Sequence, residues 1–435
     1  MRRKIFVAGL AAATAMGLAA CGNGANNADG NSSSSSGGND GNVVDVVTWW
    51  SAGSEKEGLE ALVKVFNQQF PNVKFENKAV AGGGGSQAKQ KLAADLAAKT
   101  PPDTYQAHAG AELQEAIDSG YLQDVSGLYD EFKLKEAFPK TLMDRLTVDG
   151  KIYSIPSNVH RSNVVWANSS VLKEVGLDAA NPPKDMDSWI ADMEKVKAAG
   201  KTPITVGMAW TQLNLFENVL LADLGADGYT GLFNGKTDWN GDGVKKAIGH
   251  YDQILKLADK SLLSEDWEPA MKPVVDGTAA YNVMGDWALA SFNAAGKKAP
   301  ADYVYFAVPG TEGTFNFLAD SFTLPVGAKH EDGAKDWLKT ISSKEGQIAF
   351  NTVKGSIPSR SDLSEDEISK FSEYQQSAMK DFAKDTIVPS IAHGAAVPAP
   401  VSNAMADALS KFAQGGSDAA GLQAELAQAA QKLNK

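Results

Sequence analysis

The pattern of hydrophobic and polar positions changes abruptly near residue 43. Val43 to Trp50 is an almost continuous apolar run, which predicts a buried strand. Apolar residues then recur at helical spacing, with Ser54 as a candidate N-cap; they are Leu59, Leu62, Val63, Phe66 and Phe70. Val73 to Val80 has the pattern of a second strand. This strand–helix–strand opening predicts a parallel sheet.

The same alternation continues along the chain, and we find no internal repeat. Further helices are predicted at residues 87–98, 111–119, 189–199, 211–224 and 244–257, and further strands at 104–108, 164–166, 281–284 and 303–308. From about residue 365 the pattern is almost wholly helical. The predicted fold class is α/β with two lobes, and the extended segments at 153–156, 303–310 and 355–359 are candidate crossovers between them.

The N-terminal segment has the pattern of a secretory signal peptide over residues 1–20. Arg2, Arg3 and Lys4 precede a short apolar run that ends in small residues, followed at once by a polar tract, so a membrane-spanning helix is not predicted. Leu18-Ala-Ala-Cys21 resembles the bacterial lipobox, whose cysteine is lipidated, as with palmitate. The alternative is ordinary cleavage after Ala20 with a free thiol. Residues 21–42, rich in Gly, Asn and Ser, predict a flexible linker with a reach of roughly 25 Å.

Composition limits the classes of function. Without Arg2, Arg3 and Lys4 the chain has 38 Lys plus Arg against 53 Asp plus Glu, a formal charge of −15. This acidic balance argues against nucleic-acid binding. Cys21 is the only cysteine, so no intramolecular disulfide can form. The remaining length suffices for two ordinary domains.

Aromatic, acidic and amide side chains gather near predicted strand ends, where open parallel sheets bind ligands. Trp49 and Trp50 are neighbours, so one is expected in the core and the other in a cleft. Gln106 and His108 lie two residues apart on one strand and therefore share a face. Both side chains can donate and accept hydrogen bonds, which suits either hydroxyl recognition or a solvated capping role.

Later segments repeat this mixture of groups. Asn158, His160 and Trp166 line the next extended run, with the same two alternatives of hydroxyl recognition or a solvated or capping role. A carboxylate also stands beside or near an aromatic residue in Asp286-Trp287 and in Asp320-Ser-Phe322. Sugars require such a mixture, because their apolar faces stack on Trp while acids and amides bind their hydroxyl edges. Lys354 and His393 are further polar candidates.

Other motifs are weaker. Residues 238–243 (Asp-Trp-Asn-Gly-Asp-Gly) match the first half of an EF-hand loop, but Gly249 replaces the bidentate glutamate, so an Asx turn before a helix is the alternative. The glycines at 82–85 lack the Lys-Ser/Thr of a phosphate-binding loop. His108, His160 and His393 lack the short spacing of zinc ligands. We therefore expect no metal and no cofactor.

In their order along the chain, several segments resemble the family 1 sugar-binding lipoproteins of ABC importers, most closely the glucose/galactose-binding type. They are Trp49-Trp50, Thr104-Tyr-Gln-Ala-His-Ala-Gly110, Asn158-Val-His-Arg-Ser-Asn163, Trp210-Thr-Gln212, Asn282-Val-Met-Gly-Asp-Trp287, Asp320-Ser-Phe322, Lys354-Gly-Ser-Ile357 and His393-Gly394. The resemblance implies a periplasmic-binding-protein-like fold with a cleft between discontinuous lobes. One lobe would comprise residues 43–155 with 310–355, and the other 156–305 with 360–435.

The resemblance also implies a set of sugar-binding residues. Trp49, Trp50, Glu55, Gln106 and His108 would form one wall, Asp320 and Lys354 would bind hydroxyl groups, and Trp287 and His393 would come from the facing lobe. A second tier comprises Asn158, His160, Trp210 and Asp286. No residue is expected to be catalytic.

Together these observations predict the extracytoplasmic component of an ABC sugar importer. It would bind a glucose-, galactose- or mannose-like monosaccharide as a monomer and deliver it to a membrane permease. A lipid anchor at Cys21 would suit a Gram-positive envelope, which has no outer compartment to retain a soluble receptor. The alternatives are a cell-surface glycoside hydrolase using two of Glu55, Asp286 and Asp320, and a metal-binding lipoprotein.

Overall fold

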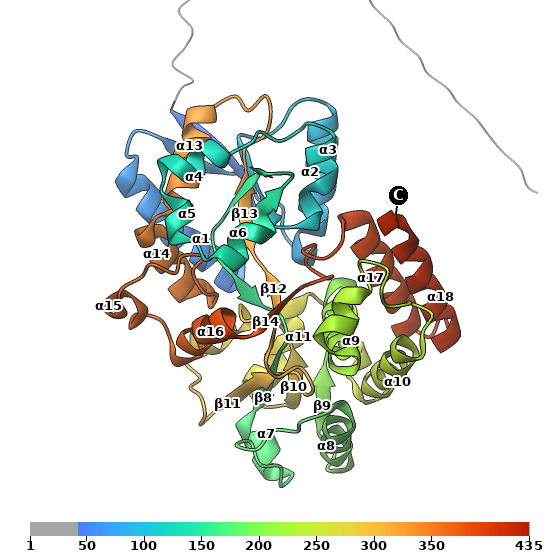
Figure 1. Cartoon of the computed structure of the whole chain (residues 1–435). Helices are drawn as coiled ribbons and strands as arrows, with labels where there is room; N and C mark the ends of the chain where they lie inside the picture. Colours follow the sequence, from blue (N-terminus) through green and yellow to red (C-terminus); the bar gives the residue numbers. More distant parts are fainter. Residues whose placement is uncertain (1–41, 435) are drawn as a thin grey trace, which may run out of the picture. The chain divides into compact units, whose positions relative to one another are not determined.

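The computed structural model describes residues 42–434, which form two α/β lobes built around two larger sheets (Figure 1). The predicted fold class is therefore confirmed. The predicted signal peptide, Cys21 and all but the last residue of the predicted linker lie outside the described residues.

The first sheet has five strands in the order β2-β1-β3-β13-β6. Their bounds are β1 Val43–Val47, β2 Lys74–Asn77, β3 Thr104–His108, β6 Ser154–Pro156 and β13 Asp320–Thr323. β1 is parallel to β2 and β3, as predicted, whereas β13 is antiparallel to β3 and β6. The pairing of β13 with β3 places Asp320 opposite His108 and Phe322 opposite Gln106. A strand from late in the chain is thereby held beside the strand that carries His108.

Helices α1 (Gly53–Gln69) and α2 (Ser86–Ala97) make the two connections of this parallel part. The apolar side of α1 is buried through Leu59, Leu62 and Phe66, which is why the helical period was visible in the sequence. Helices α13 (Glu331–Ser342) and α14 (Lys344–Lys354) return to this lobe and pack against α1.

The start of α1 differs from the prediction. The N-cap is Ala52, which makes no side-chain capping bond. Ser54 lies inside the first turn, and its hydroxyl instead contacts Glu268 from the other lobe. Strand β1 also ends at Val47, so Trp49 and Trp50 lie in the turn between β1 and α1.

The remaining elements of this lobe are short. They are α3 Gln114–Asp118, α4 Ser126–Glu131, α5 Leu134–Ala137, α6 Lys140–Leu146, and a hairpin of β4 Thr147–Val148 and β5 Lys151–Ile152. The predicted helix at 111–119 begins as a 3₁₀ turn, Ala111–Leu113, and continues as α3.

The second sheet has four strands in the order β11-β8-β10-β9. Their bounds are β8 Val164–Asn168, β9 Thr202–Thr205, β10 Ala279–Val283 and β11 Tyr303–Ala307. The helices of this region are α7 Ser169–Glu174, α8 Met186–Ala198, α9 Ala209–Gly231, α10 Asp242–Leu257, α11 Trp267–Asp276 and α12 Ala288–Ala294. Within α9, Gly225 has a φ of 67°, so the helical conformation breaks where the sequence pattern predicted an end.

A three-stranded sheet, β14-β12-β7, lies where the chain passes between the lobes. Its strands are β7 His160–Arg161, β12 Thr314–Leu318 and β14 Thr386–Pro389. β12 continues through Ala319 into β13 of the first sheet, and β6 leads into β7 over three residues. Val159 and Ile357 exchange backbone hydrogen bonds of 2.8 and 3.0 Å beside these segments. The predicted crossover at 303–310 is wrong, because most of it is β11 of the second sheet.

The C-terminal part is mainly helical, as predicted, with β14 as an exception. Its helices are α15 Glu365–Ile368, α16 Glu373–Lys384, α17 Ala399–Ala413 and α18 Ala419–Ala430. α17 packs against α9 and α18 against α10, so the end of the chain covers the second lobe (Figure 1).

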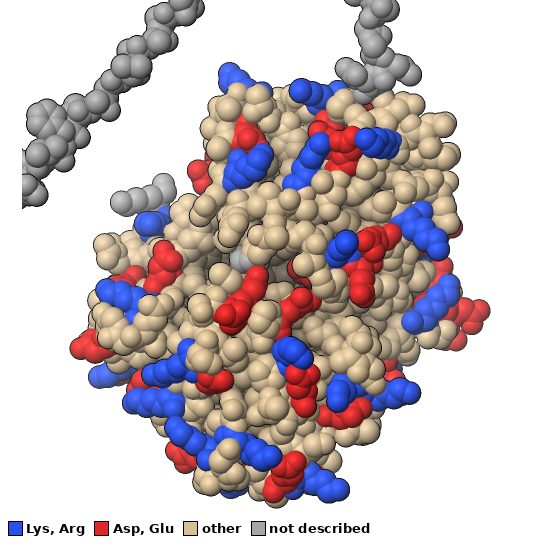
Figure 2. All heavy atoms as spheres, turned by 180° about the vertical axis from the view of Figure 1, so that it is seen from behind, with Lys and Arg blue, Asp and Glu red and all other residues tan. Residues whose placement is uncertain are grey.

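Two hydrophobic clusters form the main core. One includes Val44, Phe66 and Trp337, and the other includes Trp189, Tyr251 and Leu409. Among residues 42–434, none of the helices combines the length and apolar character needed to cross a bilayer. Figure 2 shows acidic and basic side chains interspersed over the face seen from behind, without a continuous basic surface on that face.

Candidate functional site

A cavity of about 240 Å³ lies between the two lobes, where the ends of β3, β12 and β13 meet the loops of the second lobe. It is lined by Trp49, Ser51, Ala52, Glu55, Ala81, Gly82, Gly84, His108, His160, Trp210, Asp266, Trp267, Glu268, Pro269, Trp287, Leu318, Asp320, Lys354 and His393. The lining combines four tryptophans with carboxylate, imidazole and ammonium groups. This is the mixture of flat apolar surfaces and hydrogen-bonding groups that polar ring-shaped ligands require.

The structure brings most of the predicted residues to this one cavity. Seven of the nine line it: Trp49, Glu55, His108, Trp287, Asp320, Lys354 and His393. Two of the second tier, His160 and Trp210, do so as well. They come from segments far apart in the sequence, and the folding of β13 against β3 is what joins them.

Trp50 does not line the cavity, which corrects its assignment as a wall residue. Its side chain is fully buried, and its ring lies 4.8 Å from that of Phe350 and 5.8 Å from that of Phe322. Trp49 is the partner that faces the cavity. The two neighbouring indoles therefore have different roles, one in the core and the other at the cavity, as the sequence predicted for the pair.

Three further predicted residues do not line the cavity but contact residues that do; they are Gln106, Asn158 and Asp286. Gln106 Nε2 donates to Asp320 Oδ1 at 2.9 Å, and its Oε1 accepts from the backbone N of Trp49 at 3.2 Å. Asn158 Nδ2 donates to Asp320 Oδ2 at 2.8 Å. Asp286 bonds to the ring of His160. These three side chains therefore orient residues that do face the cavity.

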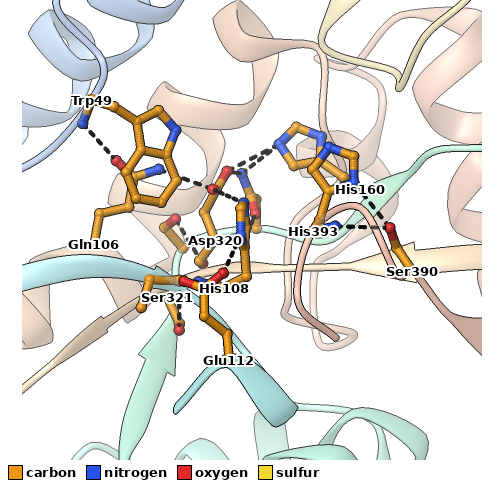
Figure 3. Close-up of polar contacts among 12 residues, drawn as sticks. Trp49, Gln106, His108, Glu112, His160, Asp320, Ser321, Ser390 and His393 are labelled. Atoms are coloured by element: carbon orange, nitrogen blue, oxygen red, sulfur yellow. Dashed lines mark hydrogen bonds and ion pairs between the residues drawn. The ribbon is translucent and has the colours of Figure 1, made fainter. Parts of the chain in front are cut away.

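Asp320 is the centre of the polar network (Figure 3). Its carboxylate accepts from Gln106, Asn158 and, at 3.1 Å, His160 Nε2, and His108 Nε2 lies 3.7 Å away. Burial opposes its charge, but the hydrogen bond and positive charge of His160, with His108 and Lys354, hold its pKa well below the usual range. Asp320 is thus a fixed anion and a hydrogen-bond acceptor.

His160 lies between two carboxylates. Its Nδ1 contacts Asp286 and its Nε2 contacts Asp320. Burial lowers the pKa of this imidazole, but the two anions outweigh burial and raise it above the ordinary value. The carboxylates on the two nitrogens, together with Asn158 Nδ2 at 2.9 Å from Nε2, hold the ring in one orientation.

A second charged cluster supports His108. Glu112 Oε2 accepts from His108 Nδ1 at 2.9 Å and from Lys89 Nζ at 2.8 Å, and Glu112 Oε1 accepts from the backbone N of His108 at 3.0 Å. Burial alone would raise the pKa of Glu112, but Lys89 and His108 lower it to about 2. With Nδ1 held by Glu112, the Nε2 edge of His108 faces Asp320.

Lys354, at the end of α14, and Glu55, in the first turn of α1, form a buried ion pair, with Nζ 2.5 Å from Oε1. Lys354 is 2% exposed and Glu55 19%. Burial raises the pKa of Glu55 despite the lowering effect of Lys354. Lys354 Nζ also lies 5.8 Å from the ring centre of Trp50, so the core indole supports the cation from behind.

Aromatic rings line the cavity from both lobes. On the first lobe, Trp49 lies 5.2 Å from the ring of His108, with Lys89 Nζ 5.1 Å from its indole centre. On the second lobe, Trp287 lies 6.4 Å from Trp210, and His393 lies 5.2 Å from Trp287 and 5.7 Å from Trp210. Both lobes therefore supply aromatic rings on which a flat ligand could stack.

His393 is the one imidazole at the cavity with a buried nitrogen that lacks a partner among the described residues. Its Nδ1 lies 2.9 Å from Ser390 Oγ, whereas its Nε2 has no hydrogen-bond partner (Figure 3). Burial, with the positive charges of His108 and Lys89, keeps its pKa well below the ordinary value. The ring is therefore neutral, with an unused nitrogen at the site.

Several residues of the site were not singled out from the sequence. Glu268 of α11 accepts from the backbone N and the hydroxyl of Ser54 across the cleft. The Gly82–Gly85 segment approaches the site closely: a Cβ at Gly85 would lie 2.6 Å from the ring of Trp49. Glu112 contacts His108 on the side away from Asp320, and Lys89 is paired with Glu112. The spacing of Glu112 four residues after His108 is the one signal that could have indicated such a pair.

The described residues contain no group of three or more His, Cys, Asp or Glu side chains placed to hold a metal ion. At the 238–243 loop, Asp238 Oδ1 accepts from the backbone N of Asn240 at 2.9 Å, which is an Asx turn. The N-cap of α10 is Gly241 rather than an acidic side chain. The turn alternative therefore describes this loop, although no side chain of the loop caps the helix.

A cavity that is lined by aromatic and polar side chains from both lobes is typical of a two-lobed ligand-binding protein. The family model of bacterial extracellular solute-binding proteins matches residues 52–348. The chain is 35% identical over 374 residues to an uncharacterized ABC transporter extracellular-binding protein of Pyrococcus horikoshii, covering 85% of this chain and 83% of that one. It is 32% identical over 380 residues to a probable sugar-binding periplasmic protein of Rhizobium meliloti, covering 85% and 88%.

Two further comparisons are more distant. A xylose/arabinose-binding protein of Haloferax volcanii is 26% identical over 366 residues, covering 81% of this chain and 77% of that one. The solved structure of a chitin oligosaccharide binding protein is 19% identical with a TM-score of 0.79, covering 91% of this chain and 99% of that one. The latter likeness is one of fold.

This chain belongs to the family of bacterial extracellular solute-binding proteins. The family is one of extracellular proteins, and the relatives above are named as an ABC transporter extracellular-binding protein, a probable sugar-binding periplasmic protein and a xylose/arabinose-binding protein. The relatives are transport proteins that bind substrates rather than enzymes that convert them.

Proposed function

We propose that this protein binds a monosaccharide of the glucose, galactose or mannose type in the cavity between Trp49 and Trp287. The volume of about 240 Å³ carries this proposal, because it lies just below the usual range of small-molecule sites, about 300–1,000 Å³. An oligosaccharide needs a longer groove. The names of relatives that bind xylose, arabinose or glucose support a ligand of this size, although a pentose would fit the same argument.

Each wall has a distinct role in this proposal. Trp49 and the Trp210–Trp287 pair stack on the two faces of the pyranose ring. Asp320 and Glu55 accept hydrogen bonds from hydroxyl groups, and Lys354 and His108 donate to them. His393 Nε2 supplies one further acceptor from the second lobe. Because the contacts come from both lobes, the ligand favours the closed arrangement over an open one.

Closure about the crossing strands would bury the sugar and present one closed form to the permease. We place the hinge at residues 157–159, 318–320 and 355–359, where the chain passes between the sheets. The lobes would then be close to the ranges that the sequence predicts, 43–155 with 310–355 and 156–305 with 360–435. The one change is that the chain would return to the first lobe at about Ala319 instead of residue 310.

We also propose that the protein is a monomer, anchored through lipid on Cys21 to a cell without an outer membrane. The order of charged, apolar and small residues before Cys21 supports this anchor. A short tether keeps the receptor near its permease and so raises its effective concentration there.

The geometry does not favour a glycoside hydrolase. Such an enzyme needs a carboxylic acid that can give up a proton at the scissile bond. The pKa of Asp320 is held well below its usual range by His160. Asp286 is fully buried against His160 and the backbone N of Arg161, and it does not line the cavity. Glu55 lines the cavity and burial raises its pKa, but its Oε1 is paired with Lys354 Nζ at 2.5 Å, which leaves no second carboxyl group among the three candidates for the reaction.

The proposal is tested by thermal unfolding in the presence of a library of monosaccharides and disaccharides. A ligand at one hundred times its Kd stabilises the folded state by about 2.7 kcal/mol, which raises Tm measurably. We expect shifts with monosaccharides in the wild type and none in Trp287→Ala. The matched control is Trp239→Phe, a buried indole of the other core cluster, which should lower Tm yet keep the sugar-dependent shift. Shifts with disaccharides alone would contradict the proposal.

A further inference from the structure

Glu217 is a buried carboxylate of α9 that does not line the cavity. It is fully buried, and its two oxygens accept hydrogen bonds from backbone N–H groups and from hydroxyls. Oε2 accepts from the backbone N of Ile391 at 2.5 Å and of Ala392 at 3.0 Å. Oε1 accepts from the hydroxyls of Ser390 at 2.8 Å and Ser162 at 3.2 Å. A glutamate so far from solvent requires a reason, because burying the charge is costly.

Ser390 connects this carboxylate to the site. Its hydroxyl has one proton to donate and two lone pairs that accept. Glu217 Oε1 is an acceptor, so the Ser390 proton is given to Glu217. The lone pairs of Ser390 Oγ must then accept from His393, whose backbone N lies 3.2 Å away and whose Nδ1 lies 2.9 Å away.

This sequence of hydrogen bonds determines the proton position on His393. Because Ser390 Oγ can accept but not donate toward the ring, Nδ1 carries the proton. The neutral ring then has a bare lone pair on Nε2. That nitrogen is the buried atom without a partner among the described residues, on a residue that lines the cavity.

We propose that the ionised Glu217 carboxylate is a positioning group that, through Ser390, fixes His393 as the Nδ1–H tautomer, so that Nε2 accepts a hydrogen bond from a ligand hydroxyl. The role of the ligand hydroxyl rests on the proposed sugar-binding function. The tautomer itself does not, because it follows from contacts among the protein's own residues.

The consequence is selectivity at one position of the ligand. A hydroxyl opposite His393 can donate its proton to Nε2, whereas a methoxy group or a hydrogen atom at the same carbon cannot. The latter ligands would leave the buried nitrogen unpaired, and sites built to pair with a hydroxyl reject such analogues strongly.

The protonation of Glu217 would reverse this arrangement. Burial raises the pKa of Glu217 to about 7, against the lowering effect of the bonds from Ala392, Ser390, Ile391 and Ser162. A neutral Glu217 that donates to Ser390 turns the hydroxyl toward His393 Nδ1, which moves the ring proton to Nε2.

The other titratable groups near this chain of hydrogen bonds are few. Tyr229 contacts Glu217, with Oη 3.4 Å from Oε2, and burial raises the pKa of Tyr229 so that it stays neutral. The charged and titratable groups that face His393 are His108, Lys89, His160 and Asp320.

The variant that separates these states is Glu217→Gln. Its amide oxygen can accept from Ile391 and Ala392, and its amide NH₂ then faces Ser390 and Ser162. Ser390 Oγ becomes an acceptor from the amide and donates to His393 Nδ1. The change is nearly isosteric, yet it predicts the opposite tautomer with a proton on Nε2.

The test is long-range ¹H–¹⁵N correlation of ¹⁵N-histidine-labelled protein, without sugar, at about pH 8, where Glu217 is ionised. We expect His393 to have a protonated Nδ1 in the wild type and a protonated Nε2 in Glu217→Gln. Ser162→Ala removes the other hydroxyl from Oε1 and should keep the wild-type tautomer. The same tautomer in the wild type and Glu217→Gln would overturn the proposal.

Ser390→Ala keeps the proposal testable if Glu217→Gln does not fold. Without the hydroxyl, Nδ1 loses its acceptor, and we expect signals of both tautomers in exchange. An unchanged Nδ1–H signal in that variant would overturn the proposal. If the wild type has the predicted tautomer but binds no sugar, the proposed function fails while the role of Glu217 stands. If it binds sugar, Glu217→Gln should weaken binding at least tenfold.

Discussion

Glu268 and Ser54 join the two lobes across the cavity. Glu268 Oε1, near the start of α11, accepts from the backbone N of Ser54 at 3.3 Å and from its hydroxyl at 3.2 Å. Ser54 lies in the first turn of α1, where backbone N–H groups are unpaired and the helix dipole favours an anion. Gly53 has a φ of +53°, and a Cβ there would overlap the carboxylate oxygens of Glu268. This contact therefore links the two lobes in the arrangement that the structure shows.

Replacing Glu268 with Ala should speed the release of bound sugar. The two hydrogen bonds together contribute about 1–2 kcal/mol, so we expect dissociation to be roughly 10-fold faster. Stopped-flow fluorescence of the cavity tryptophans measures the rate. Glu265→Ala removes an exposed carboxylate of the preceding loop and serves as the charge-matched control. Equal rates for both variants would show that the contact does not hold the lobes together.

Trp49 and Trp50 provide a matched pair of neighbouring residues. Trp49 lines the cavity, so Trp49→Ala should weaken monosaccharide binding about 30-fold, or about 2 kcal/mol, with a smaller effect on Tm. Trp50 is fully buried against Phe350, so Trp50→Phe should reduce the free energy of unfolding by about 1–3 kcal/mol while binding persists. Calorimetry and denaturant unfolding separate the two. The reverse pattern would mean that the two indoles have been assigned to the wrong sides.

The buried Glu112 predicts an acid-sensitive contribution to stability. Its pKa is lowered from 4.5 to about 2 by Lys89 and His108, against burial. A depressed carboxyl pKa stabilises the folded state above about pH 4.5, and the contribution is lost as pH falls toward 2. The full amount is on the order of 3 kcal/mol.

Urea unfolding between about pH 5 and pH 2.5 measures this slope. Glu112→Gln should be less stable than the wild type at neutral pH and should lose less stability on acidification. Glu60→Gln, in which the exposed carboxylate of a surface pair is removed, should follow the wild type. Parallel curves for the wild type and Glu112→Gln would contradict the predicted role of Glu112.

Cys21→Ser tests the proposed lipid anchor. Without the thiol no lipid can be attached, so the protein should move from the membrane fraction of its native host to the medium. Sugar affinity should not change, because the lining of the cavity consists of residues from Trp49 onward. Retention of the variant on the membrane, or loss of binding by the released form, would contradict the proposed purpose of the anchor.

The fold was predictable where local periodicity carries the information. β1, α1 and β3 follow directly from apolar spacing, because each buries one side or both sides in a single core. The antiparallel insertion of β13 beside β3 was not predictable, since it depends on a pairing across about two hundred residues. The crossover near residue 319 was predicted too early, at 303–310. An apolar strand has the same pattern in either sheet, so the sequence pattern could not assign 303–307 to the second sheet.

The candidate site was predictable in part. The residues that line the cavity lie at strand ends or in segments with a family resemblance, so their types and order were informative. The supporting residues were not, because Glu217 and Ser390 lie in a helix and a loop without any distinctive spacing. Gln106 was expected at the wall, but the register of β13 turns its amide toward Asp320 instead.

The central claim is a monosaccharide site between the lobes, and isothermal titration calorimetry of the wild type tests it most directly. Glucose, galactose and mannose are compared with a pentose and with maltose and cellobiose. We predict about one bound monosaccharide per chain, with a Kd in the micromolar range or below for at least one hexose, about −8 kcal/mol or more favourable. Tight binding of a disaccharide with no detectable binding of any monosaccharide would contradict the account.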